Sequence, residues 1–367
     1  MKTCPKLNLL AIVALAGLIS SPHPGSAQDG APPVQTVYVH PTPYDDAASG
    51  AALLKAVSEI TDASARKRYV VKLEPGIYSL GAGMLAMKPF VDLEGSGQRA
   101  TIIQGTGVTD ESRTTGLIKG ASSAEIRNLQ VIAEEASKQS ARIAIVVDGA
   151  DTWITDVTVR ARGAGSNWGI RNANAAAPRI EDTTVFASNG SINYGISNDG
   201  PSVAPVIKRM VVDVSGETAT GIAFFGGAVA KEMRDLQVHV ASGKQVRGVM
   251  IDTTGTQPDP NAKYAFRITG STVTVERGYG VYAHGPGITI NVEQSQVRAA
   301  GAGTIGIYNI DGTVVVDHSE IAAEDLTVVA GAARIGATRL EGGAVPFGKC
   351  AGVYDESFTF YAGPECP

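Results

Sequence analysis

The sequence predicts an all-β solenoid, a parallel β-helix of about nine or ten coils. One short phrase returns along the chain, and a second phrase returns between its copies with the same period of about 26 residues. Repetition at roughly 20–50 residues is typical of solenoids. Glycine supplies 43 of 367 residues and only 18% of residues are charged, a composition that favours many turns over long helices.

The first phrase is exemplified by ITDVTVRA, residues 154–161, in which β-branched residues and alternation with polar residues dominate. Its copies begin at residues 126, 154, 180, 207, 233, 268, 292 and 316. This chemistry is typical of strands rather than helices. The longest gap contains TQPDPNAK, residues 256–263, a proline-rich stretch that we expect to form a loop.

The second phrase is a glycine followed by Ile or Val, with its glycines at residues 169, 195, 221, 248, 280 and 306. Two interleaved phrases with one period indicate that the chain completes one coil per repeat. Strands of successive coils then lie about 4.8 Å apart. One coil cannot bury its own apolar residues, but a stack of coils can.

Both ends of such a stack need caps, because terminal coils expose unpaired strand edges. Residues 49–60 are expected to form an amphipathic capping helix within an N-terminal segment, residues 28–67. Leu53, Val57 and Ile60 share one face of this helix, and Ser49 is its predicted N-cap.

The β-helix is expected to occupy residues 68–345, and residues 346–367 are expected to form the opposite cap. Cys350 and Cys366 are an even pair in a chain predicted to be exported, so we expect a disulfide between them. Two free thiols or half of a metal site are the alternatives. No His or Cys stands at ligand spacing beside them.

Residues 1–27 have the pattern of a signal peptide, with an early basic pair, an apolar run and small residues ending at Ala27. A cytosolic protein with an apolar first helix is the alternative. Cleavage would remove two lysines and no acid, so the formal charge would pass from −5 to −7. This charge argues against nucleic acid and anionic membranes as partners. No stretch is long enough for a transmembrane segment. The predicted location is periplasmic or secreted.

Residues 68–105 contain a strand followed by PGIY, VDLEGSG and TIIQG. This series resembles the first coils of the pectin-lyase-like right-handed parallel β-helix superfamily, especially its pectinesterase-like branch. The later coils look like the general repeat of that superfamily, so the resemblance spans about residues 36–345. It implies a right-handed helix and a polysaccharide or cell-surface glycan as partner.

The catalytic motifs of that superfamily have no full counterpart in this chain. The pectinesterase-like set of two aspartates, an arginine and glutamines is not matched. AHGPG, residues 283–287, lacks the aspartate pair expected of polygalacturonases. VVVDHSE, residues 314–320, shares only an Asp-His pair with pectate lyases. No cofactor is predicted, and calcium is the one metal ion that the resemblance raises.

The resemblance implies that substrates lie along the strand face that carries the glycine phrase. Strand side chains alternate, so residues one and three positions after the repeated Ile or Val are expected to point outward. Asp252 and His284 are the predicted catalytic residues, because an acid and a histidine can move a proton. The predicted substrate-binding residues are Asp199, Phe225, Tyr282 and Tyr308. The alternative is a solvated face with ordinary cross-strand aromatic packing.

Two further columns are expected to be structural. Asn128, Asp156, Asp182, Arg209 and Asp235 occupy one position of the first phrase, where sharp turns favour Asn and Asp. A cation shared between Asp156 and Asp182 is the alternative. The aromatic residues just before the repeated glycines are expected to fill the core or its corners; they are Trp168, Tyr194 and Tyr279.

Two functions therefore remain open. The first is a protein that binds extracellular polysaccharide on one strand face and processes it as a lyase, hydrolase or esterase. The second is a non-enzymatic adhesive, surface or structural rod. The sequence leaves the oligomeric state open.

Overall fold

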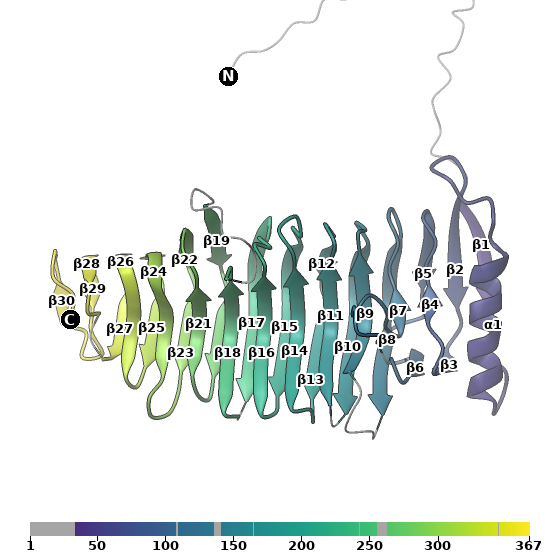
Figure 1. The fold of residues 1–367 in the computed structure, drawn as a ribbon, viewed down its shortest axis with the longest axis horizontal. Helices are drawn as coiled ribbons and strands as arrows, with labels where there is room; N and C mark the ends of the chain where they lie inside the picture. Colours follow the sequence, from purple (N-terminus) through teal and green to yellow (C-terminus); the bar gives the residue numbers. More distant parts are fainter. Residues whose placement is uncertain are drawn as a thin grey trace, which may run out of the picture. The chain divides into compact units, whose positions relative to one another are not determined.

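The computed structural model describes residues 34–107, 109–135, 141–163, 165–241, 243–254, 263–343 and 345–367. The predicted signal peptide, residues 1–27, lies outside the described residues, and so do residues 256–262 of the predicted loop. The described chain contains one α-helix and 30 strands (Figure 1). Within this part, no helix is long and apolar enough to cross a membrane.

The strands form a parallel β-helix of about nine turns, which confirms the predicted fold class. Three stacks of strands run along it, and we call the first the glycine stack because it carries the repeated glycine. Its strands are β4 (Leu85–Ala86), β7 (Ile118–Lys119), β9 (Ala141–Asp148), β11 (Ser166–Ala173), β14 (Ile192–Asp199), β16 (Thr218–Phe225), β18 (Gln245–Asp252) and β21 (Tyr279–His284).

The second stack follows the glycine stack in each coil. Its strands are β1 (Val34–Val39), β2 (Arg68–Leu73), β5 (Val91–Glu94), β12 (Arg179–Glu181), β19 (Tyr264–Thr269), β22 (Ile288–Glu293) and β28 (Gly348–Ala351). The third stack contains β3 (Gly76–Gly81), β6 (Thr101–Gly105), β13 (Thr184–Ser188), β20 (Thr272–Val275), β23 (Gln296–Ala299), β25 (Glu320–Ala323), β27 (Arg339–Gly342) and β29 (Val353–Tyr354).

Several longer strands bend from one stack into the next. Those joining the second and third stacks are β8 (Glu125–Glu135), β10 (Trp153–Gly163), β15 (Val206–Ser215) and β17 (Glu232–Ala241). Those joining the glycine and second stacks are β24 (Ile305–Asp317) and β26 (Leu326–Gly336). The pairings are parallel throughout the stacks, and β30 (Phe360–Tyr361) pairs antiparallel with β29 at the C-terminal end.

The corner between the second and third stacks is made by one left-handed residue per coil. The positive φ angles at this corner are 55° at Asn128, 57° at Asp156, 49° at Asp182, 48° at Arg209 and 56° at Asp235. Asn and Asp tolerate this conformation better than most side chains. The turn interpretation of this column is therefore correct. Arg209 bonds Asp182 across one coil, with its Nε 2.7 Å from Oδ1.

The repeated glycine lies where the glycine stack approaches the opposite wall of the core. A Cβ added to Gly195 would lie 2.4 Å from Cγ1 of Val212 and 2.6 Å from the carbonyl oxygen of Gly221. The same contact recurs at Gly248, where Cγ1 of Val273 would lie at 2.3 Å. Glycine therefore repeats because the narrow coil has no room for a methyl group there.

Helix α1 (Asp46–Glu59) covers the N-terminal end of the stack (Figure 1). Leu53, Val57 and Ile60 are buried as predicted. The predicted N-cap was wrong: the helix begins after Asp45, whose side chain accepts a hydrogen bond from the amide of Ala48 at 2.8 Å. Ser49 lies inside the first turns and is fully buried.

The C-terminal cap is closed by the predicted disulfide between Cys350 and Cys366. Cys350 lies on β28 and belongs to the buried core. Several aromatic residues of the cap are exposed, among them Phe347, Phe358 and Phe360. The disulfide therefore holds a segment that has little core of its own.

Candidate functional site

The strand register brings the predicted site residues together on the outer side of the glycine stack. Asp199 pairs with Phe225, Phe225 with Asp252, and Asp252 with His284 along successive coils. In the neighbouring column, Tyr282 pairs with Tyr308. Five of these six residues are half-buried and His284 is exposed. The predicted residues therefore share one outward surface.

A third column adjoins this surface. Its aromatic members were expected to fill the core or its corners, and Trp168, only 3% exposed, is buried as expected. Trp168 pairs with Tyr194 in register, and Arg247 pairs with Tyr279. The glycine after each of these residues makes no ladder pair with its neighbours, so alternation slips by one position there. Trp168 packs with Ile143 in a small cluster separate from the main core.

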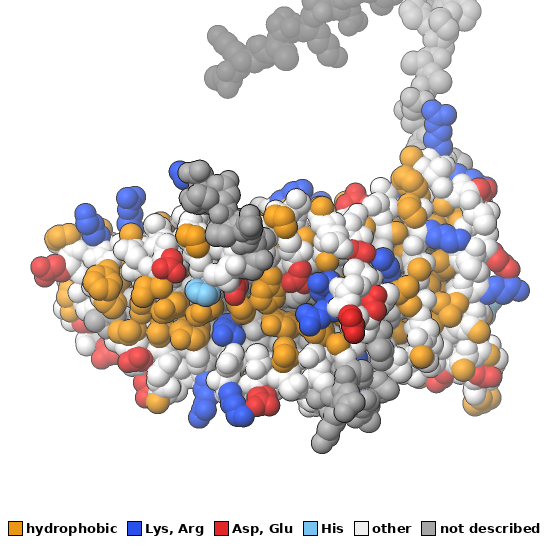
Figure 2. All heavy atoms as spheres, viewed as in Figure 1, with side chains coloured by type: hydrophobic (Ala, Val, Ile, Leu, Met, Phe, Trp, Pro, Cys, Tyr) orange, Lys and Arg blue, Asp and Glu red, His pale blue; other side chains and the backbone are white. Residues whose placement is uncertain are grey.

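We call this surface the aromatic face and define it by its charged and aromatic members, Arg113, Trp168, Arg171, Tyr194, Asp199, Phe225, Arg247, Asp252, Tyr279, Tyr282, His284 and Tyr308. Figure 2 shows hydrophobic side chains, tyrosine among them, gathered in a band along one side of the stack, with charged side chains interspersed. The sequence interpretation missed Arg113 and Arg247. Arg247 could have been found from its position before Gly248 in the repeated phrase.

The ring of Tyr282 is enclosed on both sides. Tyr308 stacks on it from the next coil, with ring centroids 5.4 Å apart and planes 5° from parallel. The guanidinium carbon of Arg247 lies 4.9 Å from the ring centroid, from the preceding coil. Tyr282 therefore presents its hydroxyl outward, not a free ring face for a sugar. Burial raises the pKa of Tyr282 against the influence of Arg247, so the hydroxyl stays protonated at neutral pH.

The tyrosine hydroxyls of this surface are unused within the described structure. Those of Tyr194, Tyr279, Tyr282 and Tyr308 form no hydrogen bond with any described residue. Burial also raises the pKa of Tyr194. The face therefore offers a row of hydroxyl groups that can donate and accept hydrogen bonds.

Two guanidinium groups of the aromatic face form no ion pair with a described carboxylate, although Arg113 is near enough to Asp199 to act on the pKa of its carboxyl in the lowering direction. The guanidinium of Arg113 lies over Trp168, 5.0 Å from the ring centroid. Its loop is held in place because Arg171 donates a hydrogen bond to the carbonyl oxygen of Arg113 at 2.7 Å. The Nε of Arg247 is buried without a hydrogen-bond partner. Cation–π contact holds both groups against the aromatic rings.

The two acids of this surface are in different environments. Nε of Arg171 lies 2.9 Å from Asp199, and the Ser197 hydroxyl donates to the same carboxylate at 3.0 Å. Burial nevertheless raises the pKa of Asp199 above its ordinary value. Oδ1 of Asp252 accepts hydrogen bonds from the amide and hydroxyl of Thr254 at 2.9 and 2.6 Å.

His284 lies beside Asp252 without a hydrogen bond to it. Its Nδ1 is 3.9 Å from Oδ1 of Asp252, which is beyond hydrogen-bond range. The histidine side chain is about half exposed, and that of Asp252 is 25% exposed. Both side chains can therefore be reached from solvent by a ligand.

No group of three or more His, Cys, Asp or Glu side chains in the described chain is arranged to hold a metal ion. Asp156 accepts a hydrogen bond from Gln98, and Asp182 is held by Arg209. His318, from the Asp-His pair noted above, lies at the corner of its coil with a φ of 46° and contacts Asp317 at 2.9 Å. These residues have structural roles in this fold.

No family model matches the sequence, and no curated protein matches it. Solved structures with similar folds include two modules from Azotobacter vinelandii. The mannuronan C-5 epimerase AlgE4 A-module is 16% identical, with a TM-score of 0.48 over 85% of this chain and 87% of that one. The AlgE6 A-module is 14% identical, with a TM-score of 0.47 over 84% and 89%.

A catalytic domain of GH87 alpha-1,3-glucanase in complex with nigerose is 8% identical, with a TM-score of 0.47 over 91% of this chain and 66% of that one. At these identities the similarity concerns the fold alone. The functional argument therefore depends on the side chains of this chain.

Proposed function

We propose that this protein binds an acidic extracellular polysaccharide along the aromatic face. The observation that carries the proposal is the pair of guanidinium groups, Arg113 and Arg247, held against aromatic rings without a carboxylate partner among the described residues. An arginine can bind a carboxylate or sulfate group through two parallel hydrogen bonds. The chain as a whole carries a formal charge of −5, so the positive charge of these two groups is a local feature that favours an acidic ligand on this face.

The spacing of the face suits a long polymer better than a small molecule. Residues from successive coils repeat at about 4.8 Å, close to the length of one sugar residue in an extended chain. The hydroxyl of Tyr194 between the arginines, and those of Tyr279, Tyr282 and Tyr308 beyond Arg247, can bond the hydroxyls of the polymer. The disulfide fits an oxidising, extracellular compartment, where such polymers occur.

Asp252 and His284 are the proposed residues for a proton-transfer step on the bound polymer. His284 is accessible, and an imidazole can donate or accept a proton in a reaction. Asp252 would orient the imidazole through its free Oδ2 once a ligand draws the two side chains together. Such a step would make the protein a polysaccharide-processing enzyme; without it, the aromatic face is a binding surface only.

The test is affinity electrophoresis and calorimetry of residues 28–367 with polyuronates, sulfated glycans and neutral polysaccharides, with and without calcium. We expect binding to acidic polymers that weakens as salt concentration rises. Arg247→Gln should weaken it about 10- to 100-fold, because hydrogen bonds to charged groups contribute about 1.5–3 kcal/mol. Arg334→Gln is the matched control, since Arg334 is exposed on β26 outside this face.

Turnover is followed in the same samples as new reducing ends, unsaturated ends or changed sugar stereochemistry. His284→Gln and Asp252→Asn should abolish turnover while binding persists. Equal affinity of the Arg247→Gln and Arg334→Gln variants, or a preference of the native protein for neutral polymers, would refute the proposal. Absence of binding to every polymer would favour the non-enzymatic rod.

A further inference from the structure

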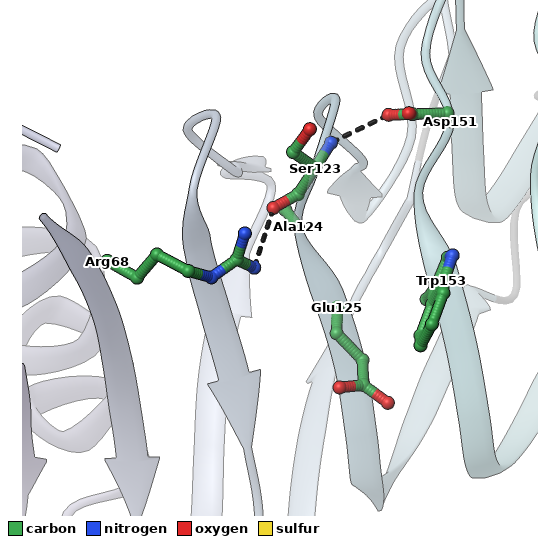
Figure 3. Close-up of a pocket in the computed structure, with 6 residues that line it drawn as sticks. All are labelled: Arg68, Ser123, Ala124, Glu125, Asp151 and Trp153. Carbon is green, nitrogen blue, oxygen red and sulfur yellow. Dashed lines mark hydrogen bonds between the residues drawn. The ribbon is translucent and has the colours of Figure 1, made fainter. Parts of the chain in front are cut away.

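A cavity of about 410 Å³ lies on the second stack near the N-terminal end (Figure 3), and none of its lining residues belongs to the aromatic face. Its lining comes from three coils: Arg68 on β2, residues 123–125 at the start of β8, and Asp151 and Trp153 around the start of β10. The volume is within the range of about 300–1,000 Å³ typical of small-molecule sites. Its residues take no part in the proposed binding of acidic polymers.

Trp153 forms one wall of this cavity and is 49% exposed, unusually high for a tryptophan on a strand. In register it lies between Glu125 on one side and Arg179 on the other. The guanidinium of Arg179 covers the ring at 5.1 Å from its centroid. The opposite ring face is therefore turned toward Glu125 and the cavity, as the edge-on ring in Figure 3 indicates.

The polar rim of the cavity is held rigidly in place. Arg68 donates hydrogen bonds to the carbonyl oxygen of Ser123 at 2.9 Å and to Asp92 at 3.1 Å. Ser123 has a positive φ of 57°, and its amide is bonded to Asp151 at 2.6 Å. A non-glycine residue in this conformation is retained where surrounding contacts fix it, which is common at binding sites.

Two polar groups on this rim remain available to a ligand. Glu125 is bonded to Arg127 through Oε2, and its Oε1 has no hydrogen-bond partner among the described residues. The hydroxyl of Ser123 is also unbonded within that part of the chain. The lining of this cavity therefore offers a carboxylate oxygen, a hydroxyl and an exposed indole ring to a ligand with hydroxyl groups around an apolar face.

We propose that this cavity binds one uncharged pyranose residue of a neutral glycan. A pyranose ring presents a face of C–H groups, which would lie on the indole of Trp153, and hydroxyls, which would bond Glu125 and Ser123. An acidic sugar is disfavoured, because Glu125 and Asp151 face the cavity while Arg68 is already paired with Asp92. The two sites therefore select different ligands, an acidic polymer on the aromatic face and an uncharged sugar in this cavity.

The two tryptophans of the chain make the proposal directly measurable. Trp153 is 49% exposed and Trp168 only 3%, so acrylamide quenching of fluorescence reports mainly on Trp153. Neutral hexaoses of glucose, mannose and galactose would be titrated to about 10 mM, a concentration that fills a site of millimolar affinity. We expect at least one of them to protect Trp153 from quenching, while hexauronates do not.

Calorimetry with the protecting hexaose then locates the site. Trp153→Ala should weaken binding at least about tenfold, as is common for an aromatic residue that a ligand covers on binding. Phe358→Ala, at an aromatic residue of the C-terminal cap that is even more exposed than Trp153, should leave it unchanged. Unchanged melting temperatures exclude misfolding. The proposal is overturned if no neutral hexaose protects Trp153, if Trp153→Ala binds like the native protein, or if hexauronates protect equally well.

Discussion

Replacement of Gly195 by alanine tests the physical origin of the repeat. The new methyl group would lie 2.4 Å from Cγ1 of Val212, 2.6 Å from the carbonyl oxygen of Gly221 and 3.1 Å from Cγ2 of Val214. Val212 is fully buried, and a valine side chain has few alternative rotamers. The carbonyl oxygen belongs to the adjacent strand and cannot move without disturbing the ladder. The clash must therefore be relieved by shifting a coil.

Overpacking of this kind costs about 1–3 kcal/mol. Because two of the contacts are far inside van der Waals distance, we expect the upper part of that range. Alanine recovers about 0.4–1 kcal/mol through the lower entropy of its unfolded chain. The expected net loss is about 2 kcal/mol. Gly303→Ala is the control, because no atom lies within 4 Å of the added Cβ. Its φ is 73°, so the left-handed conformation alone should lower the free energy of unfolding, by about 1 kcal/mol.

Urea unfolding followed by circular dichroism and tryptophan fluorescence measures the losses. A double-mutant cycle with Val212→Ala sharpens the test, because the space vacated by the valine accommodates the new methyl group. The coupling between Gly195→Ala and Val212→Ala should be about 1–2 kcal/mol in the stabilising direction. The reasoning fails if Gly195→Ala is no more destabilising than Gly303→Ala, or if the cycle shows no coupling.

Three further predictions concern the ends and corners of the stack. Replacement of Cys350 and Cys366 by serine should lower the free energy of unfolding by about 3 kcal/mol, since the bridge closes a loop of 16 residues, and reducing agent should reproduce the effect in the native protein. The hydrogen bond from Arg209 holds the pKa of Asp182 below its ordinary value. The stabilisation of the fold by this pair is therefore present above about pH 4 and is lost as pH falls through the folded pKa of Asp182. Arg209→Gln should make the melting temperature fall less steeply as the pH is lowered. Ala337 has a φ of 43° and is exposed, so Ala337→Gly should raise the free energy of unfolding by about 0.5–1 kcal/mol in the same urea assay; a decrease would contradict the corner assignment.

Local spacing was enough to predict which residues meet on the outer surface. Asp252 and His284 are 32 positions apart and share no local motif, yet both stand three residues after a repeated valine. Since every coil restarts the same register, equal positions in the repeat become neighbours in the stack. The left-handed corner at Asp156 was predictable for the same reason.

Alternation alone did not give the side of the strand on which Trp168 lies. Trp168 is buried, as expected, but in a small cluster separate from the main core. Gly169 makes no ladder pair, so Trp168 lies on the same side of its strand as the outward Arg171. The helix start was also misplaced, because Ser49 resembles an N-cap locally, whereas the contact of α1 with the first coil buries it and leaves Asp45 as the cap.

The sequence by itself determined the period, the parallel stack, the two caps, the disulfide and the residues that share the outer columns. Each follows from local chemistry repeated at a fixed interval. Only the tertiary structure decided which charges remain unpaired. Arg113 reaches Trp168 from a loop 55 positions away, and the cavity beside Trp153 joins three coils that begin at Arg68. Such contacts depend on how far loops and side chains extend across the stack, and no periodic pattern records that distance.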